Sequence, residues 1–217
     1  MDIVERFINY TKFNTTTNKE NGLKGIMPSN PTEYELAKFI KDELSSLGIK
    51  DIILQDSAIL IAKIPANCEN APSIAFFAHL DTSSEQKNDT KAKIVKYTGG
   101  DICLNEEQGI YLNFSDNPEL KKYVGDDIVV TDGTSLLGAD DKAAIASIVN
   151  MANFFMQNPD VKHGKIVICF VPDEEQGLLG AKALDVNLLG ADFGYCLDCC
   201  EIGELIYENW NAADCTA

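Results

Sequence analysis

One histidine and several acidic residues occupy positions where they could hold a metal ion. Three groups of them follow short apolar runs, and a fourth opens a predicted helix. They are His79 and Asp81 after residues 73–78, Asp173, Glu174 and Glu175 after residues 165–171, Asp198 after residues 193–197, and Asp140 and Asp141 at the helix start. In open α/β sheets, ligands bind outside the carboxyl ends of the strands. We therefore expect these side chains to meet at one edge of a sheet.

This mixture of side chains is typical of one kind of chemistry. Imidazole nitrogen and carboxylate oxygen are the usual ligands of catalytic zinc, which keeps a position open for water. Several carboxylates at one edge would repel each other strongly without a cation. Two divalent ions roughly 3.5–4 Å apart, bridged by one carboxylate, would relieve that repulsion and activate water. A further glutamate beside the ligands would serve as the general base.

Each residue also has an ordinary structural explanation. Asp140 could be a helix N-cap, which is the commoner role of an aspartate at that place. Glu174 and Glu175 could form a solvated turn, and His79 could be a histidine satisfied inside the core. These explanations are independent of one another, whereas a metal site accounts for all the placements with one cause. The metal site is therefore the favoured hypothesis.

Hydrophobic periodicity predicts the elements that must position these residues. The predicted helices are residues 2–10, with Ile3, Phe7 and Ile8 on one side; the segment after Pro31, with Leu36, Phe39, Ile40, Leu44 and Leu47 on one side and Gly48 at its end; residues 141–156; and residues 178–184. The predicted strands are residues 51–55, residues 58–64 and the three apolar runs, which suit strands covered on both faces. Strands that alternate with helices predict an α/β fold, with a layered mixed sheet and helices on both faces.

Residues 83–130 interrupt this alternation. They are polar and rich in turn residues, with short β-like segments at 101–104 and 110–114. We interpret them as a β-rich insertion within a single domain that covers the chain.

Composition excludes several functional classes. The formal net charge of −16 repels phosphate backbones and anionic lipids, so neither nucleic acid nor membrane is an expected partner. No apolar run approaches the roughly 20 residues of a membrane span, and no signal peptide is expected. The seven cysteines are odd in number, which favours reduced thiols and a cytoplasmic location. Thiol chemistry at Cys196-x-x-Cys199 is not favoured, because Cys196 falls in a predicted strand and not at a helix start.

Four motifs carry a resemblance to a known family. They are AHLDT at 78–82, TDGTSLLGADDKA at 131–143, PDEEQG at 172–177 and ELIYENWNAA at 204–213. With them the chain resembles the co-catalytic zinc exopeptidases, which include carboxypeptidase G and acetylornithine deacetylase, and most of all their tripeptide aminopeptidase branch, peptidase T. The similarity covers essentially the whole chain, and the second motif is the most specific.

The resemblance implies a metal-dependent aminopeptidase that releases the N-terminal residue of tripeptides. Its implied metal ligands are Asp140 as the bridge between two zinc ions, His79 and Asp198 at the first ion, and Glu175 at the second. Glu174 would be the general base, and Asp81 would orient the His79 imidazole. The resemblance also implies a cis peptide bond between Asp140 and Asp141.

The chain departs from the family pattern in four ways. Cys199 and Cys200 replace glycines beside a ligand, and Ala144 replaces another glycine. The family's distant second histidine has no counterpart, because His163 lies at the start of a predicted strand, opposite the site. A lid or dimerisation domain and the rest of the catalytic domain are also missing. We therefore expect a truncated chain whose second metal site is incomplete, inactive alone, from a protein that forms a homodimer and acts on small peptides.

Two alternatives stay open. The chain could be a non-catalytic metal-binding remnant or interaction module, with one zinc ion at His79, Asp140 and Asp198. It could also belong to a related deacylase or dipeptidase of the same family.

Overall fold

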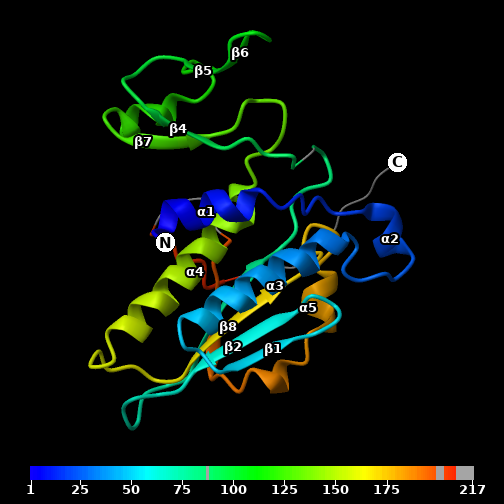
Figure 1. Cartoon of the computed structure of the whole chain (residues 1–217), viewed down its shortest axis with the longest axis vertical. Helices are drawn as coiled ribbons and strands as arrows, with labels where there is room; N and C mark the ends of the chain where they lie inside the picture. The colour runs from blue at the N-terminus through cyan, green and yellow to red at the C-terminus, as the bar shows by residue number, and fades with distance from the viewer. Residues whose placement is uncertain (87, 199–202, 209–217) are drawn as a thin grey trace.

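The centre of the fold is a five-stranded mixed sheet (Figure 1). The computed structural model describes residues 1–86, 88–198 and 203–208. The strands, in spatial order, are β1 (Asp51–Leu54), β2 (Leu60–Ile64), β8 (Ile166–Val171), β3 (Ile74–His79) and β9 (Phe193–Cys196). β3 runs parallel to both β8 and β9, whereas β2 is antiparallel to β1 and to β8. The chain therefore leaves β3, β8 and β9 at the same edge of the sheet.

Helices cover both faces of this sheet, as the sequence predicts. They are α1 (Ile3–Thr11), α3 (Pro31–Ser46), α4 (Ala139–Gln157) and α5 (Leu179–Ala183), with a 3₁₀ turn η2 at Val186–Leu188. The short helix α2 (Lys19–Leu23) lies to the side of the sheet (Figure 1) and has no buried residue. Every residue of β8 is buried, because alternate side chains enter two cores. Ile166, Ile168 and Phe170 pack with α1, α3 and α4, while Val167, Cys169 and Val171 pack near α5 and η2. This confirms the predicted α/β class.

The buried face of α1 differs from the prediction. Ile3 is 41% exposed, whereas Arg6 is 1% exposed and Tyr10 is fully buried. Hydrogen bonds to Glu43 of α3 satisfy both polar groups. The prediction was wrong because hydrophobic periodicity treats arginine as an exposed residue. It therefore placed Ile3, and not Arg6, on the buried face of the helix. Phe39 of α3, also predicted as a core residue, is 37% exposed.

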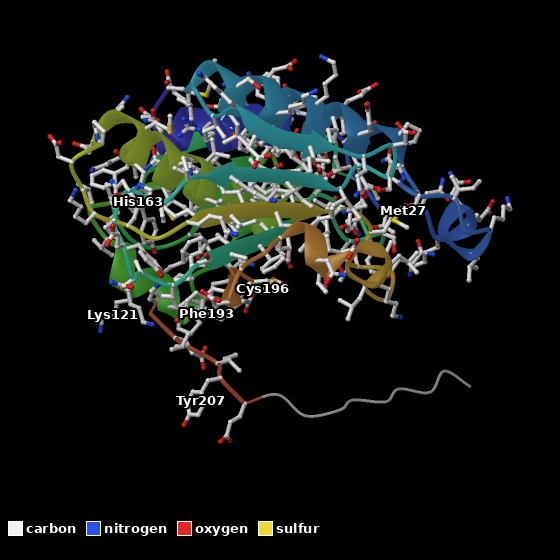
Figure 2. All side chains as sticks on the ribbon, turned by 90° about the horizontal axis from the view of Figure 1, so that it is seen from below. Met27, Lys121, His163, Phe193, Cys196 and Tyr207 are labelled. Atoms are coloured by element: carbon white, nitrogen blue, oxygen red, sulfur yellow. The ribbon has the colours of Figure 1, made fainter. Side chains whose placement is uncertain are left out.

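β9 corrects a second expectation. We predicted a strand covered on both faces, but all four of its residues are exposed, with Phe193 at 45% and Tyr195 at 40%. β9 lies at the edge of the sheet and pairs only with β3 among the described strands. Figure 2 shows Phe193 and Cys196 at the rim of the molecule. An apolar run predicts a strand, but its burial depends on the elements around it.

The predicted insertion forms two small sheets with a core of their own. β4 (Lys93–Lys96) pairs with β7 (Asp127–Val130), and β5 (Ile102–Asn105) pairs with β6 (Ile110–Leu112). A 3₁₀ segment, η1 (Pro118–Tyr123), contributes Leu120 to a cluster with Tyr97 and Ile102. Only β5 and β6 were predicted. β4 and β7 were missed because both are short, β4 has a lysine at each end, and β7 follows polar residues. Figure 1 shows these strands well separated from the central sheet.

None of the helices in the described part of the chain combines the length and the apolar character needed to cross a membrane.

Candidate metal centre

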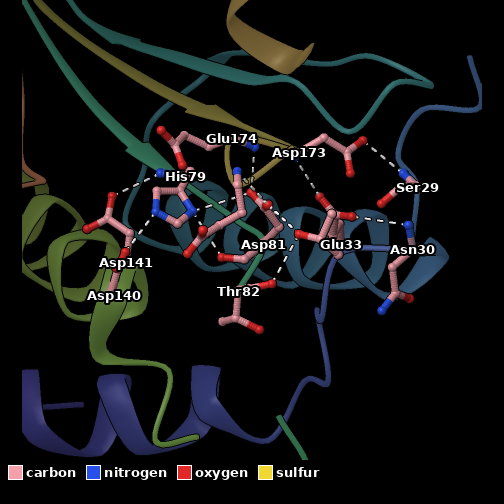
Figure 3. Close-up of polar contacts among 12 residues, drawn as sticks. Ser29, Asn30, Glu33, His79, Asp81, Thr82, Asp140, Asp141, Asp173 and Glu174 are labelled. Atoms are coloured by element: carbon pink, nitrogen blue, oxygen red, sulfur yellow. Dashed lines mark hydrogen bonds and ion pairs between the residues drawn. The ribbon is translucent and has the colours of Figure 1, made fainter. Parts of the chain in front are cut away.

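The His79 ring is the centre of the candidate site (Figure 3). His79 is the last residue of β3 and is 3% exposed. Its Nε2 lies 2.9 Å from Oδ1 of Asp140, and its Nδ1 lies 2.9 Å from the backbone oxygen of Asp81. Its backbone N–H donates to the carboxylate of Asp141 at 3.0 Å. The imidazole is therefore fixed from both sides by residues that were predicted to surround it.

Asp81 links the end of β3 to the turn after β8. Its buried carboxylate accepts hydrogen bonds from the backbone N–H groups of Glu174, at 2.8 Å, and Glu175, at 3.1 Å. The hydroxyl of Thr17 donates to it at 2.7 Å. The carboxylate lies 3.3 Å from His79 Nδ1, farther than the backbone oxygen of the same residue. Asp81 thus holds the turn at residues 173–175, here called the glutamate turn, at least as firmly as it orients the imidazole.

The Asp140–Asp141 step has the geometry that the resemblance implies. The peptide bond between the two residues is cis. Both have non-helical backbone angles at the start of α4. Asp141 is buried and accepts from His79, while Asp140 is exposed and faces the ring nitrogen. Asp140 therefore contacts the imidazole, whereas Asp141 holds the backbone of His79.

Each predicted ligand belongs to at least one group of side chains that could hold a metal ion. Three overlapping groups bring ligand atoms within 4.8 Å of one another: His79, Asp140 and Glu175; His79, Glu174 and Asp198; and Asp140, Asp141 and Asp198. One imidazole and several carboxylates are a donor set that suits zinc and similar divalent ions. The second histidine, His163, belongs to none of these groups among the described residues. It lies before β8, and its ring packs on Phe155 with centroids 4.8 Å apart.

The electrostatics of the cluster suit a cation. Burial raises the pKa of Glu174 and of Glu175, and neighbouring carboxylates add to the effect. Burial also raises the pKa of Asp141, to about 8. Crowded acids resist ionisation, and a divalent ion among them would relieve their repulsion.

The charge of His79 is coupled to the same acids. Burial lowers the pKa of His79, but hydrogen bonds with Asp140 and Asp81 and the nearby carboxylates outweigh it and raise the value to about 11. The hydrogen bond with His79 in turn lowers the pKa of Asp140. Burial alone would raise the pKa of Asp81, yet its hydrogen bonds lower it. An imidazole must lose its proton to bind a metal, so metal binding here would release a proton.

Several residues around the site were not predicted. Thr17, Glu33 and Lys142 are buried within or behind it. Glu33 could have been found, because Asn30 and Glu33 have the spacing of a capping box. Thr17 and Lys142 carry no comparable signal, since their burial depends on tertiary packing.

The thiol hypothesis gains no support. Burial and neighbouring carboxylates raise the pKa of Cys196 to about 11, the opposite of what a reactive thiol needs. Cys199, Cys200 and the end of the 204–213 motif lie outside the described residues.

Comparison with known sequences identifies relatives over almost the whole chain. A family model described as peptidase family M28 matches residues 60–187. A protein named peptidase T from Alkaliphilus oremlandii is 44% identical over an alignment of 217 positions, which covers 98% of this chain and 52% of the relative. A peptidase T from Parabacteroides distasonis is 44% identical over 215 aligned positions, and the alignment again covers 98% of this chain and 52% of the relative. The chain thus spans about half the length of the curated relatives it matches.

Solved structures agree with the fold. The aminopeptidase PepT from Bacillus cereus has a TM-score of 0.63 and 26% identity, covering 91% of this chain and 43% of that one. A tripeptidase from Staphylococcus aureus has a TM-score of 0.61 and 22% identity, covering 92% and 43%. Because its sequence identity is only 22%, the similarity to the tripeptidase supports the fold alone.

Proposed function

Since the chain belongs to peptidase family M28, we propose that it supplies most of the catalytic centre of a metal-dependent aminopeptidase. The proposed reaction releases the N-terminal residue of short peptides, with tripeptides as the preferred substrates. Because the chain spans about half the length of its relatives, this activity belongs to the whole protein. The 217-residue chain alone is expected to be inactive.

The proposed metal ligands are His79, Asp140, Glu175 and Asp198. The groups that they form, with ligand atoms within 4.8 Å, support this assignment. We propose zinc, because imidazole and carboxylate donors are its usual ligands. Asp140 would bridge two ions, and the second ion would need a further ligand from another part of the whole protein.

Divalent ions bound there would polarise the peptide carbonyl and make a water molecule more acidic. Glu174 would take the proton of the attacking water and pass it to the leaving amine. Its half-buried position and raised pKa support this role, because a general base works best with a pKa near the working pH. Asp81 would keep both the imidazole and the Glu174 backbone in place.

One observation carries the proposal: side chains from position 79 to position 198 converge on one imidazole. The test uses the whole protein, a tripeptide substrate and the variants Glu174→Gln and Asp140→Asn. Glu174→Gln should lower kcat by about 10²–10⁴ with metal content and KM nearly unchanged. Asp140→Asn should reduce metal content as well. Undiminished turnover by Glu174→Gln would remove the proposed base.

A second candidate is a non-catalytic module that holds one ion at His79, Asp140 and Asp198. It is favoured by the presence of a single imidazole in the three groups. Metal analysis of the 217-residue chain separates the two ideas when combined with a tripeptide assay. One ion per chain without turnover by the whole protein would support the module, and turnover by the whole protein would exclude it.

We also propose the organisation and location of the whole protein. Residues 1–217 would be a partial catalytic domain with an insertion at about 83–130, completed by the rest of that domain and by a lid or dimerisation domain. The length of the relatives supports this division. The dimerisation domain would make the whole protein a homodimer. A cytoplasmic location is in keeping with the free thiols of Cys68, Cys103, Cys169 and Cys196. Light scattering of the whole protein tests the dimer.

A further inference from the structure

A buried carboxyl group lies directly behind the glutamate turn. Glu33, in the first turn of α3, has no exposed surface. One of its oxygens accepts the backbone N–H of Asn30, at 3.1 Å, and closes a capping box. The other accepts the backbone N–H of Asp173, also at 3.1 Å. The second contact has nothing to do with helix capping, because it crosses 140 positions to the residue before Glu174.

A reciprocal bond strengthens this contact. The backbone N–H of Ser29, just before α3, donates to the carboxylate of Asp173 at 2.8 Å. Asp173 has a φ of +53°, which L side chains rarely adopt. Such a conformation persists only where the surroundings hold it. Here the start of α3 holds Asp173 by its backbone and by its side chain, as Figure 3 shows.

The other side of the turn is held in the same manner. The next two backbone N–H groups, those of Glu174 and Glu175, donate to the buried carboxylate of Asp81. Three consecutive N–H groups thus point at two buried acids, Glu33 and Asp81. With its backbone fixed on both sides, the turn has little freedom to redirect the Glu174 and Glu175 side chains.

We propose that Glu33 is a positioning residue, whose contact with Asp173 sets the backbone of the turn and so aims Glu174 and Glu175 at His79 and Asp140. The roles of Glu174 and Glu175 as base and ligand rest on the proposed function. The mechanical role of Glu33 does not, because it concerns the backbone alone.

Four variants separate positioning from helix capping. Glu33→Ala removes both hydrogen bonds. Glu33→Asp keeps a carboxylate near the helix start but shortens its reach toward Asp173. Glu33→Gln keeps length and shape: its amide oxygen can still accept the backbone N–H of Asp173, whereas its NH2 group cannot accept the backbone N–H of Asn30. Glu43→Ala is the matched control, since Glu43 is a partly buried acid on the same helix that contacts Arg6 and Tyr10.

The experiment measures two quantities on the 217-residue chain. Amide hydrogen exchange of the segment around residues 173–175 is followed in the metal-free protein. Affinity for Co²⁺, and its visible absorption spectrum, report the geometry of the ligands. Glu33→Ala and Glu33→Asp should exchange faster at this turn, bind Co²⁺ about 10–100-fold more weakly and give an altered spectrum. The Co²⁺ affinity of Glu33→Gln should stay within about threefold of the wild-type affinity.

The control decides the interpretation. Glu43→Ala should lower the unfolding temperature yet leave the exchange of the turn and the Co²⁺ spectrum as in the wild type. If Glu33→Ala and Glu43→Ala change both readouts equally, Glu33 is only a structural residue and the proposal is wrong. If Glu33→Ala does not fold, comparing Glu33→Asp with Glu43→Ala decides the question in its place. A wild-type chain that binds no Co²⁺ would count against the proposed metal site, whereas the exchange of the turn would still test Glu33.

Discussion

At the scale of single residues, burial controls the charge of the acids behind the site. Glu33 is fully buried, and burial together with the neighbouring Asp173 and Asp81 carboxylates raises its pKa to about 9. Burial lowers the pKa of the Lys142 ammonium to about 7, although the nearby Asp81 and Glu33 carboxylates raise it. A carboxyl group with a pKa of about 9, as Glu33 has, is neutral at pH 7. The glutamate turn is therefore held on one side by a neutral acid and on the other by the ionised Asp81, whose pKa is lowered.

This difference predicts a pH dependence of stability. The ordinary pKa of Glu33 is 4.5 and the folded-state pKa is about 9. The contribution of the protonated Glu33 carboxyl group to the free energy of unfolding is fully present below pH 4.5. It is lost as the pH rises to about 9, because in that interval Glu33 releases its proton only in the unfolded chain. Glu33→Gln should therefore show a shallower fall of unfolding free energy between pH 5 and pH 9, by at most about 1.4 kcal/mol per pH unit. Urea unfolding across this range measures it, and parallel curves for the two proteins would contradict it.

The buried Lys142 gives a second prediction at this scale. Its ammonium group donates to the backbone oxygen of Phe13 and to the side-chain oxygen of Asn88, and it has no exposed surface. Lys142→Met keeps the length but leaves two buried acceptors unpaired, so the unfolding free energy should fall by about 2–4 kcal/mol. Lys38→Met, at an exposed lysine paired with Asp42, should leave the unfolding free energy nearly unchanged. Equal losses for the two variants, measured by chemical denaturation, would show that Lys142 has no special role.

At the scale of elements, a polar network joins the three helices on one face of the sheet. Arg6 of α1 contacts Glu43 of α3 at 2.8 Å and Asn150 of α4 at 3.1 Å. Tyr10 donates to the same glutamate at 2.6 Å. The relative position of α1, α3 and α4 therefore depends on a shared carboxylate as well as on apolar packing.

A double-mutant cycle tests that dependence. Tyr10→Phe and Glu43→Ala should each destabilise the chain, but the double variant should cost less than the sum, with a coupling energy of about 0.5–3 kcal/mol, because both changes remove the same hydrogen bond. Free energies of unfolding for the four proteins supply the cycle. Additive effects would mean that Tyr10 and Glu43 act independently.

The elements also show where sequence reasoning succeeds. The buried strands β3 and β8 and the helix α4 were predicted because their apolar periodicity is strong. The convergence of His79, Glu174 and Glu175 was predicted because parallel strands end at the same edge. The exposure of β9 and the burial of Arg6 were not predicted, because each depends on which other elements are adjacent. Thr17 and Lys142 were missed for the same reason, since a polar residue reveals its buried role only through its partners.

At the scale of the whole molecule, the described residues form three hydrophobic clusters. Two of them, the larger being the main core, lie on opposite faces of the central sheet, and the third, a small cluster around Tyr97, Ile102 and Leu120, lies in the insertion. The base of the insertion is tied to the main body near the site. Asn88 accepts from the Lys142 ammonium, and Thr90 donates to the backbone oxygen of Leu136. The outer part of the insertion should therefore be separable from the fold, while its base should not.

Replacing residues 95–128 with a short linker tests this division. Ile94 and Val129 are paired across β4 and β7, so their Cα atoms lie about 4.5–5.5 Å apart and about four residues can connect them. Val129, which packs against the main core, is retained. The shortened chain should unfold cooperatively, within about 1 kcal/mol of the wild type, because independent regions contribute additively. Asn88→Ala should cost about 1–3 kcal/mol instead, since it leaves the buried Lys142 ammonium short of an acceptor. If the shortened chain loses cooperative unfolding while Asn88→Ala is harmless, the outer insertion and not its base stabilises the region around the candidate metal centre.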